Sequence, residues 1–265
     1  MHNITQTGYL PGYYGNPEYH FTRQFARRVH VCFDNVSHDP TADINVLVQC
    51  EPPELYQRFA GMVQETYTNF NLILTYDTRI LELPNAVEFC PVGAWINPNQ
   101  VTLDKQDQIT YLMSSKIYTN AHRLRFVIMR RFSHLKRLGN FDFLMHRSPP
   151  RVLNKEVFYT SAKFNIACEN QIIPNMYTEK LLDCFATRTV PIYFGCTNLE
   201  KYFDVRGVIQ FWNIEQLEHI IANLTAEDYE QRLPYIEANY ELARPFWELN
   251  AFQRIENMIA QNLGL

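Results

Sequence analysis

The sequence predicts an α/β protein that contains two Rossmann-like domains. Short apolar and β-branched segments alternate along the 265 residues with longer segments of helical periodicity, a pattern typical of mostly parallel sheets covered by helices. A polar stretch at residues 97–108 interrupts the alternation, and a strand–loop–helix–strand pattern restarts after it. We therefore expect an N-terminal domain over residues 1–105, a C-terminal domain over residues 106–265, a cleft between them, and a final helix that is able to cross back to the first domain.

In the first half, apolar runs and the residues that stop them indicate the elements. Residues 45–50 have the composition of a buried strand, and Pro52 and Pro53 stop it because proline has no N–H to donate to a sheet. Apolar side chains then recur at helical spacing before the next apolar runs. The expected elements of this half are strands at residues 45–50, 72–76 and 87–92 and a helix at residues 54–68.

The second half repeats the pattern with a longer helix. A strand and a polar loop precede an amphipathic helix, which we expect Gly139 and Asn140 to end. Each later strand is a short apolar run followed by a helical segment. The expected strands are 109–113, 141–145, 164–167, 190–194 and 208–211, and the expected helices are 121–138, 178–187, 215–223, 226–242 and 246–263.

The bulk composition limits the classes of function. With 46% hydrophobic residues the chain can build a sizeable core, and its net charge of −4 offers no general attraction to nucleic acid or anionic lipid. The six cysteines are scattered singly with no CxxC pair, so we expect reduced structural thiols and no zinc site. We find no signal segment and no apolar run near the roughly 20 residues of a membrane span, so we expect a soluble cytoplasmic protein without an integral membrane segment.

The densest group of polar residues lies after an apolar strand of the second half. Glu169 and Asn170 follow that strand directly, and ligands bind at the carboxyl ends of strands in doubly wound sheets. Thr178 or Asn175 can cap the helix that follows. Lys180 in its first turn opposes the helix dipole unless an anion such as a diphosphate compensates it. Glu179 is a candidate acceptor for two ribose hydroxyls. Ordinary capping with a solvated lysine is the alternative interpretation.

Two arginines stand at the start of the long helix. Arg123 and Arg125 are again at the unfavourable end of the helix dipole, and a pyrophosphate held by bidentate guanidinium contacts would account for them. The alternative is an amphipathic basic helix whose arginines face solvent.

A carboxylate in the first half is a candidate general base. Glu51 lies at the end of a strand and is followed by two prolines, which hold it in place. Such a group can accept a proton from a sugar hydroxyl. The alternative is that the Glu-Pro-Pro sequence only ends the strand.

Six segments, taken in order, resemble the signature of the α-1,3/4-fucosyltransferases. The family patterns in the second half are K-F-x-(L/I)-(A/C)-x-E-N-S, D-Y-(I/V)-T-E-K-L and V-P-V-(V/Y)-x-G, and those matched before them include E-S-P and A-R-(V/I)-(R/K)-Y. The matching segments are E-P-P at 51–53, F-N-L-I-L-T-Y at 70–76, H-R-L-R-F at 122–126, K-F-N-I-A-C-E-N at 163–170, Y-T-E-K-L at 177–181 and V-P-I-Y-F-G at 190–195.

The resemblance implies an inverting glycosyltransferase of the GT-B fold that moves fucose from GDP-fucose to a glycan hydroxyl, with no cofactor and no metal required for the chemistry. It implies that Glu51 is the general base, and that Glu169 is a second carboxylate beside the sugar ring. It also implies that Lys180, with Arg123 or Arg125, binds the GDP phosphates. The residues implied around the donor ribose and fucose are Asn170, Tyr177, Thr178 and Glu179.

Three departures from the family pattern keep alternatives open. Gln171 stands where the family has serine, Asn175 where it has aspartate, and Met176 where it has tyrosine. These positions border the expected sugar site, so a GT-B enzyme that uses another nucleotide sugar is one alternative. A non-catalytic module that binds a nucleotide or a glycan is another. The expected partners are a nucleotide-sugar donor and an oligosaccharide acceptor, and the net charge disfavours a nucleic-acid partner.

Overall fold

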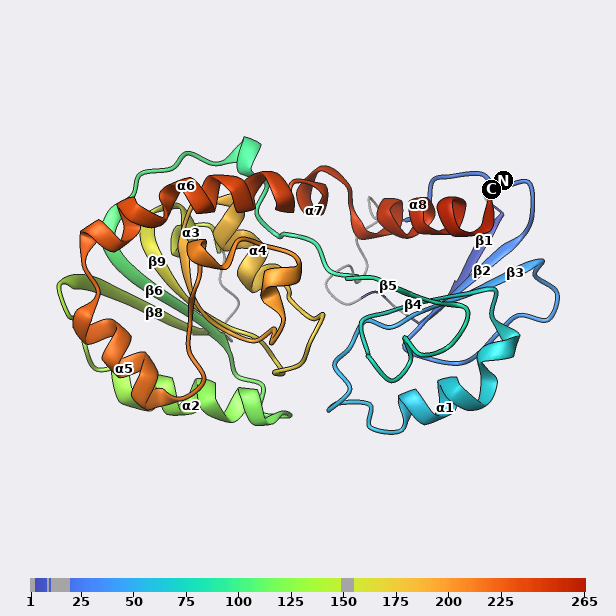
Figure 1. The fold of residues 1–265 in the computed structure, drawn as a ribbon, viewed down its shortest axis with the longest axis horizontal. Helices are drawn as coiled ribbons and strands as arrows, with labels where there is room; N and C mark the ends of the chain where they lie inside the picture. The colour runs from blue at the N-terminus through green and yellow to red at the C-terminus, as the bar shows by residue number, and fades with distance from the viewer. Residues whose placement is uncertain (1–2, 9, 11–19, 149–154) are drawn as a thin grey trace. The chain divides into compact units, whose positions relative to one another are not determined.

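The computed structural model describes residues 3–8, 10, 20–148 and 155–265 (Figure 1). The chain divides into two compact units. The first consists of residues 1–93, 174–176 and 248–265, and the second of residues 94–173 and 177–247.

The first unit contains a five-stranded sheet in which every neighbouring pair is parallel. Helices α1 and α8 cover its two faces (Figure 1). In sheet order the strands are β1 (Ile4–Thr7), β2 (Val29–Phe33), β3 (Ile44–Val48), β4 (Leu72–Thr75) and β5 (Ala86–Glu88), and the helices are α1 (Phe59–Thr66), η1 (Tyr67–Asn69) and α8 (Ala251–Leu263).

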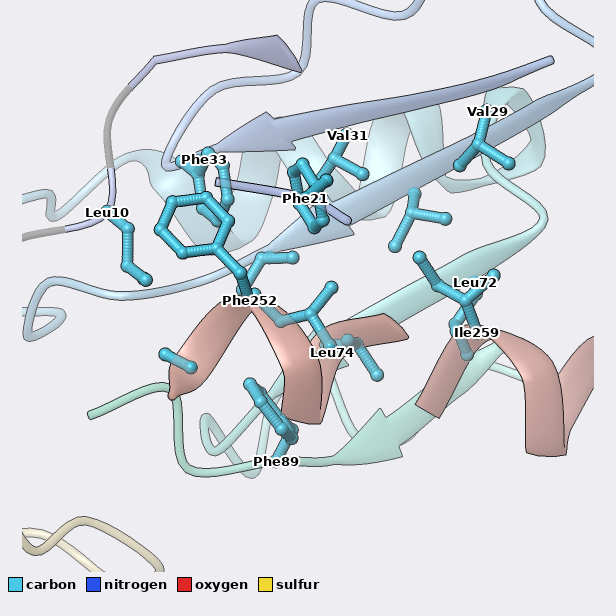
Figure 2. Close-up of a cluster of buried hydrophobic side chains, with 14 of the residues drawn as sticks. Leu10, Phe21, Val29, Val31, Phe33, Leu72, Leu74, Phe89, Phe252 and Ile259 are labelled. Atoms are coloured by element: carbon cyan, nitrogen blue, oxygen red, sulfur yellow. The ribbon is translucent and has the colours of Figure 1, made fainter. Parts of the chain in front are cut away.

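The two faces of this sheet bury alternate side chains, as a strand period of two requires. On one face, Phe252 of α8 lies edge-on to Phe21, with ring centroids 4.9 Å apart, and packs on the strands beside Phe33 (Figure 2). On the other face the packed residues include Cys32, Leu47, Ile73, Phe59 and Val63. The C-terminal helix is therefore part of the core of the first unit.

The second unit contains a six-stranded sheet in which all strands except β7 are parallel to their neighbours. Helices α2 and α5 lie on one face, and α3, α4 and α6 lie on the other (Figure 1). The elements are η2 (Pro98–Gln100), β6 (Gln106–Ser114), α2 (Asn120–Phe132), β7 (Arg137–Leu138), β8 (Phe141–Ser148), α3 (Val157–Thr160), β9 (Ala162–Cys168), α4 (Glu179–Ala186), β10 (Val190–Phe194), η3 (Leu199–Lys201), η4 (Val205–Gly207), β11 (Ile209–Gln210), α5 (Ile214–Asn223), α6 (Ala226–Ala243) and α7 (Pro245–Glu248).

The strand order of this sheet is β11-β10-β9-β6-β8-β7. After β6, the chain first adds β7 and β8 on one side of this strand and then β9, β10 and β11 on the other side. The chain leaves β6 through α2 and reaches β8 on one side, whereas β9 pairs with the other side of β6. The segments that follow β6 and β9 therefore diverge at the carboxyl ends of these strands. In open α/β sheets this switch point is where ligands bind.

Most predicted elements are present, and three of the predicted helices differ clearly in their bounds. Among the strands, the one expected at 87–92 is limited to Ala86–Glu88 and the one expected at 45–50 ends at Val48. The predicted helix at 121–138 ends at Phe132, because Arg137 and Leu138 pair antiparallel with β8 through a tight turn. Gly139 in that turn has φ +57°, a conformation that favours glycine, so Gly139 closes a hairpin rather than a helix. The predicted helix at 54–68 begins only at Phe59. The predicted final helix is broken at Asn250, whose side chain caps α8.

The division between the units falls between Gly93 and Ala94, twelve residues before the boundary that composition suggests. The backbone N–H groups of Trp95 and Ile96 donate to Asp183 Oδ1 at 2.7 and 3.0 Å, which attaches this segment to the second unit. Residues 248–265 belong to the first unit, where Arg254 donates to the carbonyl oxygen of Cys90 at 2.8 Å.

The cysteines and the helices bear on two further expectations from the sequence, reduced thiols and the lack of a membrane span. The six cysteines form no disulfide, and five of them are buried. No helix in the described part of the chain combines the length and the apolar composition that a membrane span requires.

Candidate active site

Glu169 is the buried centre of a polar cluster in the second unit. It follows β9 directly, and its backbone N–H donates to the carbonyl oxygen of Phe194. Glu169 as a whole is 0% exposed. Its Oε1 accepts from the backbone N–H of Thr178 at 2.8 Å, and its Oε2 accepts from the Thr178 hydroxyl at 2.6 Å. The Tyr193 hydroxyl lies 3.4 Å from Oε1. The carboxylate thereby fixes the residue that caps α4.

The charge state of Glu169 reflects two opposing effects. Burial raises the pKa of Glu169 above its usual value, and the Lys180 ammonium, 3.6 Å from Oε2, acts in the opposite direction together with the hydrogen bonds from Thr178. The carboxylate is buried and both of its oxygens accept hydrogen bonds from Thr178, so the geometry supports a positioning role for Glu169. Its expected role beside the sugar ring stays a prediction.

Glu179 and Lys180 form an ion pair in the first turn of α4. Lys180 Nζ lies 2.8 Å from Glu179 Oε1 and 3.0 Å from the Thr178 hydroxyl. Burial pushes the pKa of Glu179 upward, but Lys180 and Lys155 outweigh it and hold the pKa at about 2. Glu179 is therefore an ionised acceptor at neutral pH, next to a cation and to the N-terminus of a helix.

The start of α2 is bonded to the same end of β9. Thr119 caps α2, and its hydroxyl donates to the carbonyl oxygen of Asn170 at 2.5 Å. Arg125 is 3% exposed and donates to Asn170 Oδ1 at 2.7 Å and to the carbonyl oxygen of Cys168. The structure thus brings the two predicted segments, the basic helix start and the residues after β9, into direct contact.

The two candidate phosphate-binding arginines have different environments. Arg125 is buried, and its hydrogen bonds hold the end of β9, so it is a positioning residue in this structure. Arg123 is exposed, and among the described residues its guanidinium has no hydrogen bond or ion pair. Of the two, Arg123 is the one whose side chain is available to a ligand.

Tyr177 lies immediately before the helix cap but packs among aromatic residues. It is 5% exposed, and its ring lies 5.1 Å from those of Tyr202 and Phe203. A contact between Tyr177 and a donor sugar stays a prediction.

Two of the positions that depart from the family pattern, Asn175 and Met176, belong to the first unit. Asn175 has φ +63°, which asparagine tolerates better than most residues.

Glu51 lies in the first unit, in a bend beyond β3. The carboxylate of Asp34 accepts from the backbone N–H of Cys50 at 2.7 Å and from that of Glu51 at 3.1 Å. Burial raises the pKa of Asp34 to about 6, a rise that these two N–H groups oppose and the charge of Glu51 reinforces. Asp34 fixes the backbone that carries the candidate base.

Several residues of this arrangement are not indicated by the sequence motifs alone. Asp34 lies 17 residues from Glu51, and its φ of +52° is visible only in the structure. Asp183 is one turn after Glu179, and burial raises its pKa although it pairs with Lys155. Thr119 and His122 form a capping box at the start of α2, although His122 stands where the usual pattern has glutamate or glutamine. Among residues 3–8, 10, 20–148 and 155–265 no group of three or more His, Cys, Asp or Glu side chains is arranged to hold a metal ion.

The last glycine of the V-P-I-Y-F-G segment permits the packing of Glu169. A Cβ added to Gly195 would lie 2.4 Å from Glu169 Cγ and 2.5 Å from the Tyr193 hydroxyl, closer than real contacts allow. We expect Gly195→Ala to displace the Glu169 carboxylate from Thr178 and to lower the free energy of unfolding by about 1–3 kcal/mol, measured by urea denaturation. The control is Gly61→Ala in α1, where nothing lies within 4 Å of the new methyl group and a small gain is expected. Equal effects of the two substitutions would contradict this account of Gly195.

The raised pKa of Asp34 predicts a pH-dependent stability. A carboxyl group whose pKa is 3.8 in the unfolded chain and about 6 in the folded one binds its proton more tightly when folded, so its contribution falls as pH rises between about 4 and about 6. Asp34→Asn keeps an acceptor for both N–H groups and removes the titration. We expect the stability of this variant relative to wild type, measured by urea denaturation, to rise by at most about 3 kcal/mol between pH 4 and pH 7. A difference that does not change with pH would refute the assignment.

Residues 103–247 match the family described as glycosyltransferase family 10 (fucosyltransferase), C-terminal part. The α-(1,3)-fucosyltransferase FucT of Helicobacter pylori is 30% identical over 70 residues, which are 26% of this chain and 15% of that protein, so the match spans a small part of the relative's length.

Solved structures extend the likeness to the fold. A crystal structure of an α1,3-fucosyltransferase with GDP-fucose superposes with a TM-score of 0.52 at 15% identity, covering 89% of this chain and 77% of that one. A crystal structure of TarM superposes with a TM-score of 0.57 at 8% identity, covering 88% of this chain and 54% of that one. The predicted α/β, GT-B-like fold class is confirmed. Because the family match takes in more than half of the residues, the chain belongs to glycosyltransferase family 10 (fucosyltransferase).

Proposed function

We propose that the protein is an inverting glycosyltransferase that moves fucose from GDP-fucose to a hydroxyl group of a glycan. The observation that carries the proposal is the Glu179–Lys180 pair at the capped start of α4, at the carboxyl end of β9. This pair lies within the segment that matches the family, and it combines a cation, an ionised carboxylate and a helix N-terminus.

The diphosphate of the donor would lie between the starts of α4 and α2. Lys180 and the exposed Arg123 supply positive charge, and the first N–H groups of each helix are donors without partners inside the helix. When the bond to the sugar breaks, negative charge develops on GDP, and fixed donors of this kind lower the barrier by several kcal/mol. These protein groups supply the stabilisation, so we expect the chemistry to need no metal ion.

The nucleoside and the sugar would contact the residues around the phosphate site. Glu179, ionised at neutral pH, is suited to accept hydrogen bonds from two ribose hydroxyls. Asn170, Tyr177 and Thr178 are the other residues that would contact the nucleotide sugar. Glu169 holds Thr178 in position for this contact.

Glu51 would act as the general base. Its carboxylate would take the proton of the acceptor hydroxyl while that oxygen forms a bond to the anomeric carbon and the bond between this carbon and the GDP oxygen breaks. The Asp34 carboxylate supports this role, because it fixes the backbone N–H of Glu51 at 3.1 Å.

Transfer of another sugar on the same fold is the second candidate. Gln171, Asn175 and Met176 depart from the family pattern at positions expected beside the sugar, and Met176 is buried where the pattern has tyrosine. These departures leave the phosphate site unchanged. They therefore favour a change of donor sugar over a loss of nucleotide binding.

The donor can be identified by thermal denaturation in the presence of ligands. We expect GDP and GDP-fucose at a hundred times their dissociation constants to stabilise the protein by about 2.7 kcal/mol and to raise its melting temperature, because a ligand that binds only the folded state adds to its stability. UDP, CMP and their sugars at the same concentrations are the comparison. Stabilisation by UDP or CMP without any by GDP would rule out GDP-fucose as the donor.

Replacement of the proposed base separates an enzyme from a binding module. We expect Glu51→Gln to lower the transfer rate by at least about a hundredfold and to leave GDP affinity within twofold of wild type, because a general base acts in the chemical step. The control is Glu65→Gln on the exposed surface of α1, which we expect to transfer at the wild-type rate. Full activity of the Glu51 variant would exclude Glu51 as the base, and no transfer by wild type with any donor would favour the binding module.

A further inference from the structure

His122 occupies an unusual place at the start of α2. It is the third residue of the helix and completes a capping box with Thr119, the role that glutamate or glutamine usually takes. The backbone N–H of Thr119 donates to His122 Nδ1 at 3.1 Å, and the backbone N–H of His122 donates to the Thr119 hydroxyl at 3.2 Å. In the family pattern this position is alanine, so the feature belongs to this chain.

These contacts determine which ring nitrogen carries the proton. The backbone N–H of Thr119 can only donate, so Nδ1 accepts from it and has no hydrogen. The Thr119 hydroxyl, 2.6 Å from Nδ1, shares its single proton between this nitrogen and the carbonyl oxygen of Asn170. Burial lowers the pKa of His122 to about 4, and the charges of Arg125, Lys180 and Lys116 act in the same direction. At neutral pH the ring is therefore uncharged and carries its single proton on Nε2.

Within the part of the chain that the structure describes, the Nε2–H group is a buried donor without an acceptor. His122 is 1% exposed, and among the described residues no group accepts a hydrogen bond from Nε2. Such a group costs about 1–3 kcal/mol if it stays unpaired, so native proteins rarely leave one without a partner. The missing partner must be an acceptor.

The surroundings specify what kind of acceptor fits. Because Nδ1 contacts the helix cap, the imidazole lies across the N-terminal end of α2, where backbone N–H groups also lack partners within the helix. The charged side chains that act on the ring are the cations of Arg125, Lys180 and Lys116. Thr119 and Arg125 link this helix end to Asn170, beside the Glu169–Lys180 cluster. An anion with several oxygen acceptors suits this environment.

We infer that His122 Nε2–H donates a hydrogen bond to a phosphate oxygen of the bound nucleotide diphosphate. The inference rests on the proposed function for the identity of the ligand, and it adds a donor-binding residue to that site. A neutral donor contributes a hydrogen bond without adding to the positive charge around Lys180.

The test separates this role from simple helix capping. His122→Glu retains the capping box and removes the donor. Asn120→Asp, at an exposed position of the same helix turn, adds a negative charge without altering His122. Calorimetry would measure binding of GDP, UDP, inorganic pyrophosphate and guanosine to wild type and both variants. Nitrogen-15 NMR of histidine-labelled wild type, assigned with the His122 variant, would follow Nε2–H during titration with pyrophosphate.

The inference predicts that His122→Glu weakens GDP and pyrophosphate binding about tenfold to a hundredfold. Asn120→Asp should stay within about threefold of wild type, guanosine binding should not change, and the Nε2–H resonance should shift with pyrophosphate. If the two variants weaken binding equally, or if the resonance does not move, the role of His122 is overturned while the proposed function stands. If wild type binds UDP and pyrophosphate but not GDP, and the variant still weakens them, the role stands and GDP-fucose falls. If wild type binds no nucleotide and no pyrophosphate, both are overturned.

Discussion

A buried carboxylate must have hydrogen bonds and a nearby cation to remain in a folded protein, and this requirement shapes the second unit around Glu169. Its acceptor oxygens hold Thr178 at the start of α4, and the Tyr193 hydroxyl and the Lys180 ammonium lie at 3.4 and 3.6 Å. Gly195 has no Cβ, and this leaves room for the side chain. The end of β9, the turn after β10 and the first turn of α4 therefore form one interdependent arrangement.

The neighbouring residue extends this arrangement to the opposite face of the sheet. Asn170 accepts hydrogen bonds from Thr119 and Arg125 of the α2 start, whereas Glu169 accepts from the α4 start. Helices α2 and α4 lie on different faces of the sheet (Figure 1), yet two consecutive residues fix both of their N-termini. Since each N-terminus carries partial positive charge, the strand end holds two such termini in fixed positions before any anion binds.

The sequence motifs predicted which segments meet, but not how individual side chains are turned. Apolar runs and proline or capping signals were sufficient for most strands and helices, because burial and backbone donors decide those elements locally. The choice between Arg123 and Arg125 was open, because helical spacing separates residues two apart onto different faces without saying which face is buried. The contact of Asp34 with Glu51 depends on a left-handed backbone conformation 17 residues away, and the hairpin at Gly139 depends on pairing with β8. The first is a tertiary effect that no local pattern contains, whereas the Gly139-Asn140 pair between Leu138 and Phe141 is itself a local hairpin signal that the helix interpretation missed.

The charge balance around Lys180 explains why a diphosphate site here would need donors beyond this lysine. Lys180 already faces the carboxylates of Glu179 at 2.8 Å and Glu169 at 3.6 Å, so its positive charge is largely compensated before a ligand arrives. A diphosphate placed beside two carboxylates would be repelled unless other donors offset them. The exposed Arg123 is available to supply positive charge, whereas Arg125 donates to two carbonyl oxygens of the protein. Backbone N–H groups and an uncharged imidazole N–H add hydrogen bonds to that charge, and the starts of α2 and α4 present both kinds of donor.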